Sequence, residues 1–306
     1  MRILVIGGGG QLGLKIIEQS KENHEIYATY LTRPPLLSSS KIFLVDKTDK
    51  NLIQSLVKTI KPDVVIDTAA FHNVDNCETN KEQAHRVNVE GTKNVAEVCD
   101  AIGAKMVFIS TDYVFKGNVG HYKETDVPSP VNYYGKSKLD GENAIKKACK
   151  NYCIARTSVI YSWFSTHNAS TKSGKPLNFG MWATQKLGKE EPLNIVNDQY
   201  SSPTLADHLA QTLLKICEED LRGIYHVAGK TRINRYDFIL KMAEKMGYNP
   251  TLIKSVSSSS LKQKAERPMD SSLNVEKIEK TLKTKMLSLD DALTIFSNQA
   301  QEGNSK

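Results

Sequence analysis

The segment RILVIGGGGQLGLKII, residues 2–17, decides the fold. An apolar run rich in β-branched residues over 2–6 passes into four consecutive glycines, and an amphipathic stretch begins at Gln11. A strand, a glycine turn and a helix in this order are typical of a dinucleotide-binding unit, in which the backbone approaches a pyrophosphate at the positive end of a helix. We therefore expect residues 2–20 to form the first strand and helix of a nucleotide-binding sheet.

Two glycine spacings can be read from residues 7–13. Gly8, Gly10 and Gly13 fit G-x-G-x-x-G, whereas Gly7, Gly10 and Gly13 fit G-x-x-G-x-x-G. Both spacings describe a tight strand-to-helix turn, and the choice between them stays open. A glycine turn without a ligand is the alternative, but clustered glycines cost stability unless a positive φ or a close approach requires them.

The rest of the first half alternates between two patterns. Further apolar runs are expected as strands over 24–30, 41–45, 63–67, 105–110 and 152–157. Amphipathic stretches between them are expected as helices over 50–60, 81–102 and 134–150. Strands and helices in alternation predict an α/β fold, a doubly wound parallel sheet covered on both faces, which is the NAD(P)-binding Rossmann fold.

The second half is less regular and predicts a smaller mixed α/β domain. Its expected elements are strands near 192–196 and 224–228, helices over 204–219 and 234–246, and a polar surface loop over 164–176. We assign residues 1–158 to the NADP-binding Rossmann domain, with some later segments returning to it. Residues 159–296 are assigned mainly to the substrate-binding domain, and 297–306 to a frayed tail.

The composition is that of a soluble globular protein, with 40% hydrophobic and 25% charged residues among 306. A net charge of +7, spread along the chain, favours a solvated basic surface over nucleic-acid binding. The five cysteines contain no C-x-x-C pair, which predicts reduced thiols in a cytosolic protein. No metal-ligand spacing, signal peptide or apolar run long enough for a membrane helix is expected.

The end of the second predicted strand bears on cofactor choice. An NAD enzyme usually has an acidic residue there for the ribose 2′-hydroxyl, but this segment reads ATYLTRPP and carries Arg33 instead. Because a guanidinium can pair with a 2′-phosphate, we expect NADP(H) to be preferred, with NAD(H) as the alternative. Arg33 could also be a solvent-facing loop arginine. Asp46, after the third strand, is expected either to bond the adenine amino group or to start the next turn.

Ligands of doubly wound sheets bind beyond the carboxyl ends of the strands. After the fourth predicted strand, Ala69 and Ala70 leave room for a cofactor. The fifth ends in ISTDYVF and places Thr111, Asp112 and Tyr113 at the same edge, although a simple turn is the alternative for these residue types.

The segment NYYGKSK, residues 132–138, contains two tyrosine–lysine pairs. At helical spacing, Tyr134 and Lys138 share a stripe with Gly141 and Ile145, whereas Lys136 joins a polar stripe. An inward lysine is costly to bury unless it is paired or employed, which favours Tyr134 with Lys138 over Tyr133 with Lys136. The Lys138 ammonium is expected to lower the tyrosine pKa from about 10 toward neutrality, so that Tyr134 can protonate a carbonyl. Thr111 would be a second hydroxyl donor.

These segments together resemble a known family. The glycine turn, STDYVF, YYGKSKLDGE, ARTS (155–158), VNDQYSSPT (196–204), IYHVAG (224–229) and ERPMDSSL (266–273) are similar to motifs of the extended short-chain dehydrogenase/reductases. Within them, the chain most resembles the dTDP-4-dehydrorhamnose reductase family, from Met1 to about residue 295. The resemblance implies NADPH- or NADH-dependent reduction of a nucleotide-linked 4-keto-6-deoxy sugar.

The resemblance also implies roles for individual residues. The implied catalytic residues are Thr111, Tyr134 and Lys138. The residues implied at the cofactor are Gly7, Gly10, Gln11, Leu12, Ala69 and Ala70. The residues implied at the substrate are Asp112 and Tyr113 for the sugar, with Gln199 and Arg267 on the nucleotide side.

Two departures from the family pattern matter. Many sugar reductases of the family have a tryptophan after R-T-S, where this chain has Val159, so the sugar stays open. Some members bind magnesium at a dimer contact through a glutamate, where this chain has Lys15, so no such metal is expected. A homodimer is a further expectation, because the helix predicted over 134–150 carries small residues that could pack against a second helix, namely Ser137, Gly141, Ala144 and Ala148. They could equally face the sheet.

Two other functions compete with the reductase. A regulatory subunit of methionine adenosyltransferase resembles the same family and binds NADP without catalysis, although the intact trio of Thr111, Tyr134 and Lys138 argues against that role. A nucleotide-sugar epimerase would share the fold but usually uses NAD, which the absence of an acidic residue near Arg33 disfavours.

Overall fold

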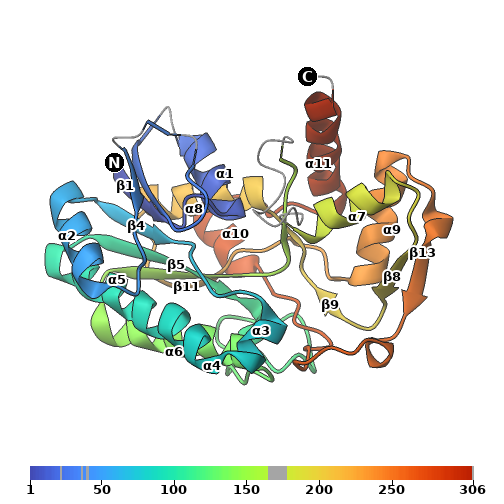
Figure 1. The fold of residues 1–306 in the computed structure, drawn as a ribbon, viewed down its shortest axis with the longest axis horizontal. Helices are drawn as coiled ribbons and strands as arrows, with labels where there is room; N and C mark the ends of the chain where they lie inside the picture. Colours follow the sequence, from blue (N-terminus) through green and yellow to red (C-terminus); the bar gives the residue numbers. More distant parts are fainter. Residues whose placement is uncertain (21–22, 36, 39–40, 165–177, 305–306) are drawn as a thin grey trace.

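A computed structural model describes residues 1–20, 23–35, 37–38, 41–164 and 178–304. The chain forms two lobes that lie next to each other, a large lobe around one sheet and a smaller lobe built from the second half (Figure 1). Almost all of the loop predicted over 164–176 lies outside the described residues.

The core of the large lobe is a seven-stranded parallel sheet in the order β11-β6-β5-β4-β1-β2-β3. Its strands are β1 (Arg2–Ile6), β2 (Glu25–Tyr30), β3 (Ile42–Leu44), β4 (Val64–Asp67), β5 (Lys105–Thr111), β6 (Tyr152–Thr157) and β11 (Gly223–His226). All neighbouring pairs are parallel. The predicted doubly wound Rossmann sheet is confirmed, and β11 is a later segment that returns to it.

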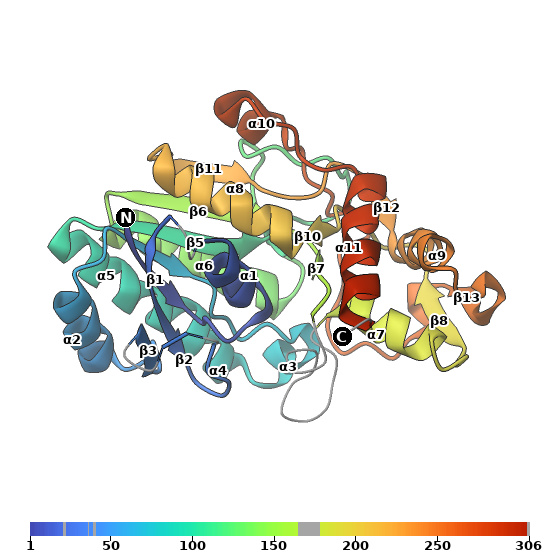
Figure 2. The same ribbon diagram turned by 90° about the horizontal axis from the view of Figure 1, so that it is seen from above.

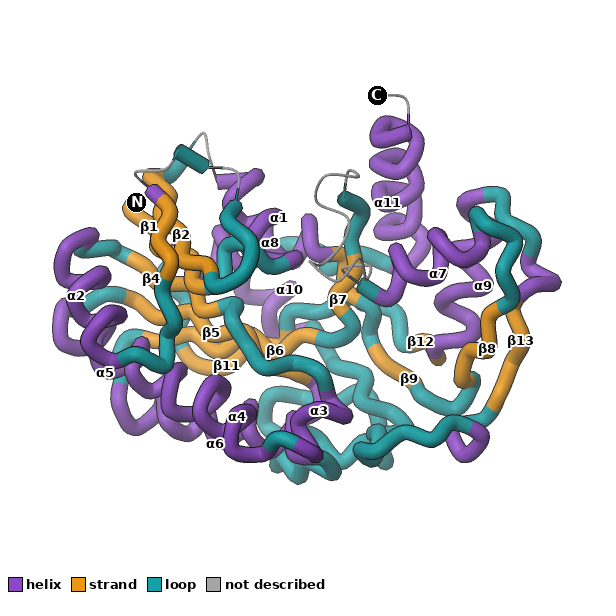
Figure 3. Tube along the Cα trace, in the orientation of Figure 1, coloured by secondary structure: helices purple, strands orange, loops and turns teal. Residues whose placement is uncertain are grey.

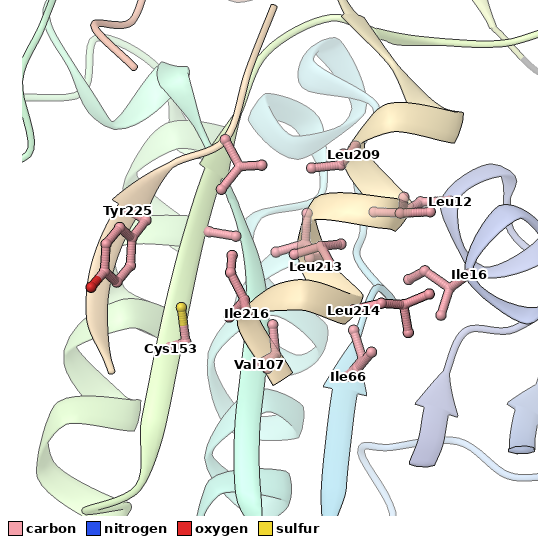
Figure 4. Packing of buried hydrophobic residues seen from close by; sticks show 14 of the residues in the cluster. Leu12, Ile16, Ile66, Val107, Cys153, Leu209, Leu213, Leu214, Ile216 and Tyr225 are labelled. Atoms are coloured by element: carbon pink, nitrogen blue, oxygen red, sulfur yellow. The ribbon is translucent and has the colours of Figure 1, made fainter. Parts of the chain in front are cut away.

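Helices cover both faces of this sheet, because its buried strands carry apolar side chains on both sides. In β1, Val5 packs into one core with α1 (Gln11–Ser20) and α8 (Ala206–Glu218), while Leu4 packs into the other. Figure 4 shows Leu12, Ile16, Leu209 and Leu213 of these two helices against the strands that carry Ile66 and Val107. The second core is closed by α2 (Lys50–Ile60), α5 (Thr92–Ile102) and α6 (Tyr133–Ala148).

The helix predicted over 81–102 contains a distortion that the sequence pattern did not reveal. It runs as α4 (Lys81–His85), a π-helical turn (Arg86–Gly91) and then α5. The turn packs closely against the Lys47 side chain. A Cβ added at Gly91 would lie only 2.9 Å from Lys47 Cγ. Such π-turns occur often at functional sites. A short helix, α3 (Val74–Thr79), precedes α4.

The smaller lobe combines short strand pairs with helices (Figure 3). The helices are α7 (Phe179–Leu187), α9 (Arg235–Met246) and α11 (Leu289–Asn304). The strand pairs are β7 (Ile160–Tyr161) with β10 (Thr204–Leu205), β9 (Tyr200–Ser201) with β12 (Ile233–Asn234), and β8 (Leu193–Val196) with β13 (Ile253–Val256). One more helix, α10 (Glu276–Leu282), packs on β11.

The frayed tail expected over 297–306 is wrong for the residues that the structure describes. Residues 297–304 continue α11, with Ala300 only 2% exposed. Gln299 donates to the Asp207 carboxylate of α8 at 2.9 Å, so α11 contacts both lobes and lies between them in Figure 2. This segment is mostly polar, so its sequence did not indicate the few buried positions that hold it against the rest of the chain.

Two further predictions can be compared with the fold. All five cysteines are buried and unpaired, as expected of reduced thiols. The small residues of α6 pack within the chain, since Ser137 bonds to Asn88 and a Cβ on Gly141 would meet the Asn88 carbonyl oxygen. They therefore give no support to a dimer contact. No helix in the described ranges is long and apolar enough to cross a membrane.

Candidate active site

The glycine turn between β1 and α1 is shaped by close backbone approaches. Gly7 has a φ of 83°, and a Cβ at Gly13 would lie 2.5 Å from the Gly7 carbonyl oxygen. A Cβ at Gly9 would collide with the Arg33 carbonyl. Gly10 differs from these three, because it is exposed and an added Cβ would meet only Gly7 O at 3.2 Å.

The open side of this turn fits a dinucleotide pyrophosphate. Gly10 presents bare backbone at the amino end of α1, where the helix favours negative charge. The side-chain amide nitrogen of Gln11 is buried and has no hydrogen-bond partner among the described residues. A buried donor without a partner is costly, and a phosphate oxygen is a suitable acceptor for it.

Replacing Gly10 by alanine should therefore weaken NADPH binding without unfolding the protein. The added methyl group makes one tight contact in the free chain, with Gly7 O at 3.2 Å, and occupies the place where a pyrophosphate would approach. We expect the Kd for NADPH to rise by about tenfold or more, with the midpoint of thermal unfolding almost unchanged. Fluorescence titration and calorimetry measure both quantities. An unchanged Kd would contradict this placement of the cofactor.

Arg33 and Asp46 lie where the second and third strands end. The Arg33 side chain folds onto the glycine turn, and its Nε and Nη2 donate to Gly9 O at 2.9 and 2.6 Å. Burial lowers the pKa of its guanidinium. Arg33 is thus held at the glycine turn rather than extended into solvent. The Asp46 carboxylate accepts from the Thr48 N–H at 2.9 Å, which is the turn-starting alternative.

A buried lysine that the sequence pattern did not single out lies beneath Ala69 and Ala70. The Lys47 ammonium donates to the Asp67 carboxylate and to Ala69 O, each at 2.7 Å, and to the Thr92 hydroxyl at 3.2 Å. Lys47 is only 3% exposed. It therefore fixes the backbone after β4, next to which the cofactor is expected.

Asn88 is a second residue that sequence reasoning missed. In the π-turn, its side-chain amide exchanges two hydrogen bonds with the backbone of Phe71, at 2.9 and 3.1 Å, and donates to the Ser137 hydroxyl at 2.9 Å. Asn88 joins the segment after β4 to α6. The sequence signal that could have indicated it is an asparagine on the inward face of an amphipathic helix pattern.

The predicted orientation of the two lysines is confirmed, with Lys138 facing inward and Lys136 facing water. Lys138 is 2% exposed, donates to Ile109 O at 2.7 Å and lies 3.9 Å from the centre of the Phe108 ring. Lys136 is exposed and pairs with Asp140 at 2.5 Å. Asn132 caps α6 by accepting from the Gly135 N–H at 2.9 Å, which sets where the helix begins.

The expected effect of Lys138 on the tyrosine pKa is not found in the cofactor-free chain. Burial raises the pKa of Tyr134, and the group that lowers it is the Thr111 hydroxyl, which hydrogen-bonds to it. Lys138 is not among the groups that shift the pKa of Tyr134 most, and its ammonium donates to Ile109 O. Burial, and then the positive charge of Lys47, lower the pKa of Lys138 itself to about 7.

This lowered pKa predicts a pH dependence of stability. Between about pH 7 and 9, folded Lys138 has largely lost its proton while the unfolded lysine, with an ordinary pKa of 10.5, keeps it. The unfolded state then binds more protons, so the free energy of unfolding should rise with pH over this range through Lys138. Urea unfolding of the cofactor-free protein and of Lys138→Met at several pH values measures the difference. Equal pH slopes would refute it.

Asp112 lies at the mouth of β5 but points into the protein. Its carboxylate accepts hydrogen bonds from the hydroxyls of Thr111 at 3.1 Å, Ser158 at 2.8 Å and Ser271 at 2.5 Å. It is 2% exposed, and burial raises its pKa. Asp112 thus joins the end of β5 to two later segments of the chain. Its predicted contact with a sugar stays a prediction.

The structure brings Tyr113 close to α6, and Gln199 and Arg267 have different side-chain partners. The Tyr113 ring lies edge-on to Tyr134, with 6.0 Å between the ring centres. Gln199 donates to the Ser258 hydroxyl at 2.8 Å in the smaller lobe. Arg267 instead pairs with Asp75 of α3 at 3.0 Å and donates to Ala265 O at 2.9 Å.

The two departures from the family pattern occupy distinct positions. Val159 has a φ of 38°, which is strained for a β-branched residue, and its carbonyl accepts from Thr204 N–H at 3.1 Å. Lys15 is buried in α1 and pairs with Asp207 of α8 at 2.8 Å. Its ammonium therefore supports the contact between two helices on one face of the sheet.

The fold and the site together define the class of protein. A Rossmann sheet with a glycine turn, a buried Y-x-x-x-K lysine at the start of α6 and a second lobe built from the later half make this chain an extended short-chain dehydrogenase/reductase. The family described as "RmlD substrate binding domain" matches residues 1–301, and the chain belongs to it.

Several characterised relatives are similar over nearly the whole chain. The probable low-salt glycan biosynthesis reductase Agl14 of Haloferax volcanii is 32% identical over 295 residues, covering 96% of each chain. The dTDP-4-dehydrorhamnose reductase of Salmonella typhimurium is 31% identical over 291 residues, covering 92% of this chain and 91% of the relative.

Solved structures agree. The dTDP-4-dehydrorhamnose reductase of Bacillus anthracis, in complex with NADP, matches with a TM-score of 0.84 and 29% identity, over 96% of this chain and 98% of the other. The UDP-glucose 4-epimerase of Thermus thermophilus, in complex with NAD, has a TM-score of 0.80 at 19% identity over 98% of this chain and 99% of the other. The second match shows the fold alone.

Proposed function

We propose that the protein reduces the 4-keto group of a nucleotide-linked 6-deoxy sugar with NADPH, as in the biosynthesis of dTDP-rhamnose and related nucleotide sugars. The observation that carries the proposal is the arrangement where β5 ends: the Thr111 hydroxyl lowers the pKa of Tyr134, and Lys138, one helical turn after Tyr134, is buried and donates to Ile109 O of the same strand. The reductases among its relatives support the substrate class.

Each residue of the site has a role in this reaction. NADPH, when bound, supplies the hydride that reduces the carbonyl carbon. Tyr134 donates its hydroxyl proton to the carbonyl oxygen, and Thr111 donates a hydrogen bond to the same oxygen. In its protonated form, Lys138 stabilises the phenolate that forms, which favours proton transfer. Lys47 and Asn88 keep the surrounding backbone in place.

Arg33 supports a preference for NADPH over NADH. Its guanidinium is held against Gly9 O, at the end of the second strand where a 2′-phosphate is expected. Replacing Arg33 by methionine should raise the KM for NADPH by about tenfold and change the KM for NADH by less than about threefold. Initial rates with each cofactor measure the ratio. Equal changes for both cofactors would show that Arg33 only shapes the glycine turn.

A panel of substrates tests the proposed function. NADPH consumption is followed with dTDP-, UDP- and GDP-linked 4-keto-6-deoxy sugars, and at least one should be reduced. Binding of NADPH without consumption on any member of the panel would refute the reductase, and co-purification with a synthetase would then favour a regulatory subunit. The five buried thiols fit the cytosolic location that we propose for this reaction.

A further inference from the structure

Arg235, the first residue of α9, is held at the boundary of the smaller lobe by its own backbone. The preceding residue, Asn234, caps α9 by accepting from the Asp237 N–H at 2.8 Å. The Arg235 N–H donates to Gln199 O at 3.2 Å. The start of α9 and the segment that carries Gln199 are therefore fixed relative to each other, so the Arg235 side chain extends from a fixed backbone.

The guanidinium of Arg235 contacts only neutral groups among its hydrogen-bond and ring partners. Its Nε lies 3.3 Å from the Gln199 side-chain oxygen and its Nη2 lies 3.5 Å from the Tyr113 hydroxyl. Its central carbon lies 5.4 Å from the centre of the Phe179 ring. These long hydrogen bonds direct the group without neutralising it.

Neighbouring arginines form ion pairs with carboxylates, whereas the carboxylate that acts on Arg235, that of buried Asp112, does so electrostatically and without an ion-pair contact. Arg232 pairs with Asp270 at 2.7 Å, and Arg267 pairs with Asp75 at 3.0 Å. Within the part of the chain that the structure describes, Arg235 has no carboxylate at ion-pair distance and is only partly exposed. Partial burial of an unpaired charge costs free energy, which an anionic ligand would offset.

The position of Arg235 relative to Tyr134 indicates which anion it meets. Tyr113 lies between them, with its hydroxyl at Arg235 and its ring edge-on to Tyr134. In a nucleotide-linked 4-keto sugar, the reacting carbon and the carbon that carries the diphosphate lie at opposite ends of one sugar ring. A cation one side chain away from the catalytic tyrosine is therefore placed for the diphosphate.

We infer that Arg235 binds the diphosphate of the nucleotide-sugar substrate, an inference that rests on the proposed function. A guanidinium can hold two phosphate oxygens at once, and the flanking Gln199 and Tyr113 keep its plane oriented. Gln199 is 4% exposed and is itself held by Ser258, so it positions Arg235. Arg267, which the family resemblance implied on the nucleotide side of the substrate, already forms an ion pair with Asp75.

The test is isothermal titration of nucleoside diphosphates into the full-length protein saturated with NADPH, so that the cofactor site is filled. dTDP, UDP and GDP are compared, and the nucleoside of the tightest binder is titrated in parallel. Arg235→Met should weaken the diphosphate by about tenfold to 100-fold and the nucleoside by less than about twofold. Arg235→Lys should recover part of the loss. Arg232→Met, which removes a nearby paired arginine, should change neither affinity by more than about twofold.

Three results would overturn the inference. They are an unchanged diphosphate affinity in Arg235→Met, an equal loss for nucleoside and diphosphate, and a wild-type protein that binds no nucleoside diphosphate. The proposed function fails separately. If the protein binds the diphosphate through Arg235 but reduces no keto sugar, the inference holds and the proposed reductase function fails. If the protein reduces a keto sugar but Arg235→Met leaves the diphosphate affinity unchanged, the proposed function holds and the inference fails.

Discussion

Replacing Tyr134 by phenylalanine should lower kcat for the keto sugar by about 10²- to 10⁴-fold and leave the Kd for NADPH within about twofold. The change removes one hydroxyl, which is the proton donor in the proposed reaction. The ring stays in place against Tyr113, since their contact is between ring faces and edges. Stopped-flow and steady-state assays of NADPH oxidation measure the rate, and fluorescence titration measures the affinity.

Tyr133→Phe is the matched control. Tyr133 stands next in the chain, and its ring lies 5.5 Å from the Lys81 ammonium rather than at Thr111. This variant should keep its turnover within about twofold of the wild type. If Tyr133→Phe lost activity while Tyr134→Phe kept it, the assignment of the catalytic tyrosine would be wrong.

The second large effect is expected on stability. Glu142 of α6 forms two hydrogen bonds with Arg156 of β6, at 2.9 and 2.7 Å, and accepts a third from the Ser110 hydroxyl at 2.6 Å. Neither charged side chain is more than 1% exposed. Glu142→Ala leaves the guanidinium buried without its partner, so the free energy of unfolding should fall by about 3–5 kcal/mol. Denaturant unfolding at neutral pH measures it.

An exposed pair on the same helix provides the comparison. Asp140→Ala breaks the ion pair with Lys136, which is open to water, and should cost about 0.5 kcal/mol or less. A double variant, Glu142→Leu with Arg156→Met, removes both buried charges and should be more stable than Glu142→Ala alone. Equal losses for Glu142→Ala and Asp140→Ala would contradict the role given to the buried pair.

Much of the fold could be predicted because its signals are local. Helix and strand periods placed α1, α2 and β6 with the bounds that the structure has. The π-turn over 86–91 was missed because residues 81–102 keep a helical pattern throughout, and the turn's contact at Gly91 is with Lys47, which is distant in sequence. The whole of α11 was missed, because its buried positions depend on contacts with both lobes, such as the one with Asp207.

The site divides in the same way. The stripe on α6 sufficed to separate Lys138 from Lys136, since helical spacing alone decides which lysine faces inward. Asp112 faces the serines of later segments, and no local pattern could indicate that. Arg235 was missed because it meets Tyr113 across 122 residues of sequence.

Transfer of deuterium tests the central claim most directly. The protein is incubated with NADPH deuterated at the C4 position of its nicotinamide and with a dTDP-linked 4-keto-6-deoxy sugar, and the product is examined by mass spectrometry and NMR. The account predicts a reduced sugar that carries deuterium on its C4 carbon, with Tyr134→Phe forming it far more slowly. A protein that binds both compounds but yields no deuterated product, or that returns an epimerised sugar without consuming NADPH, would contradict it.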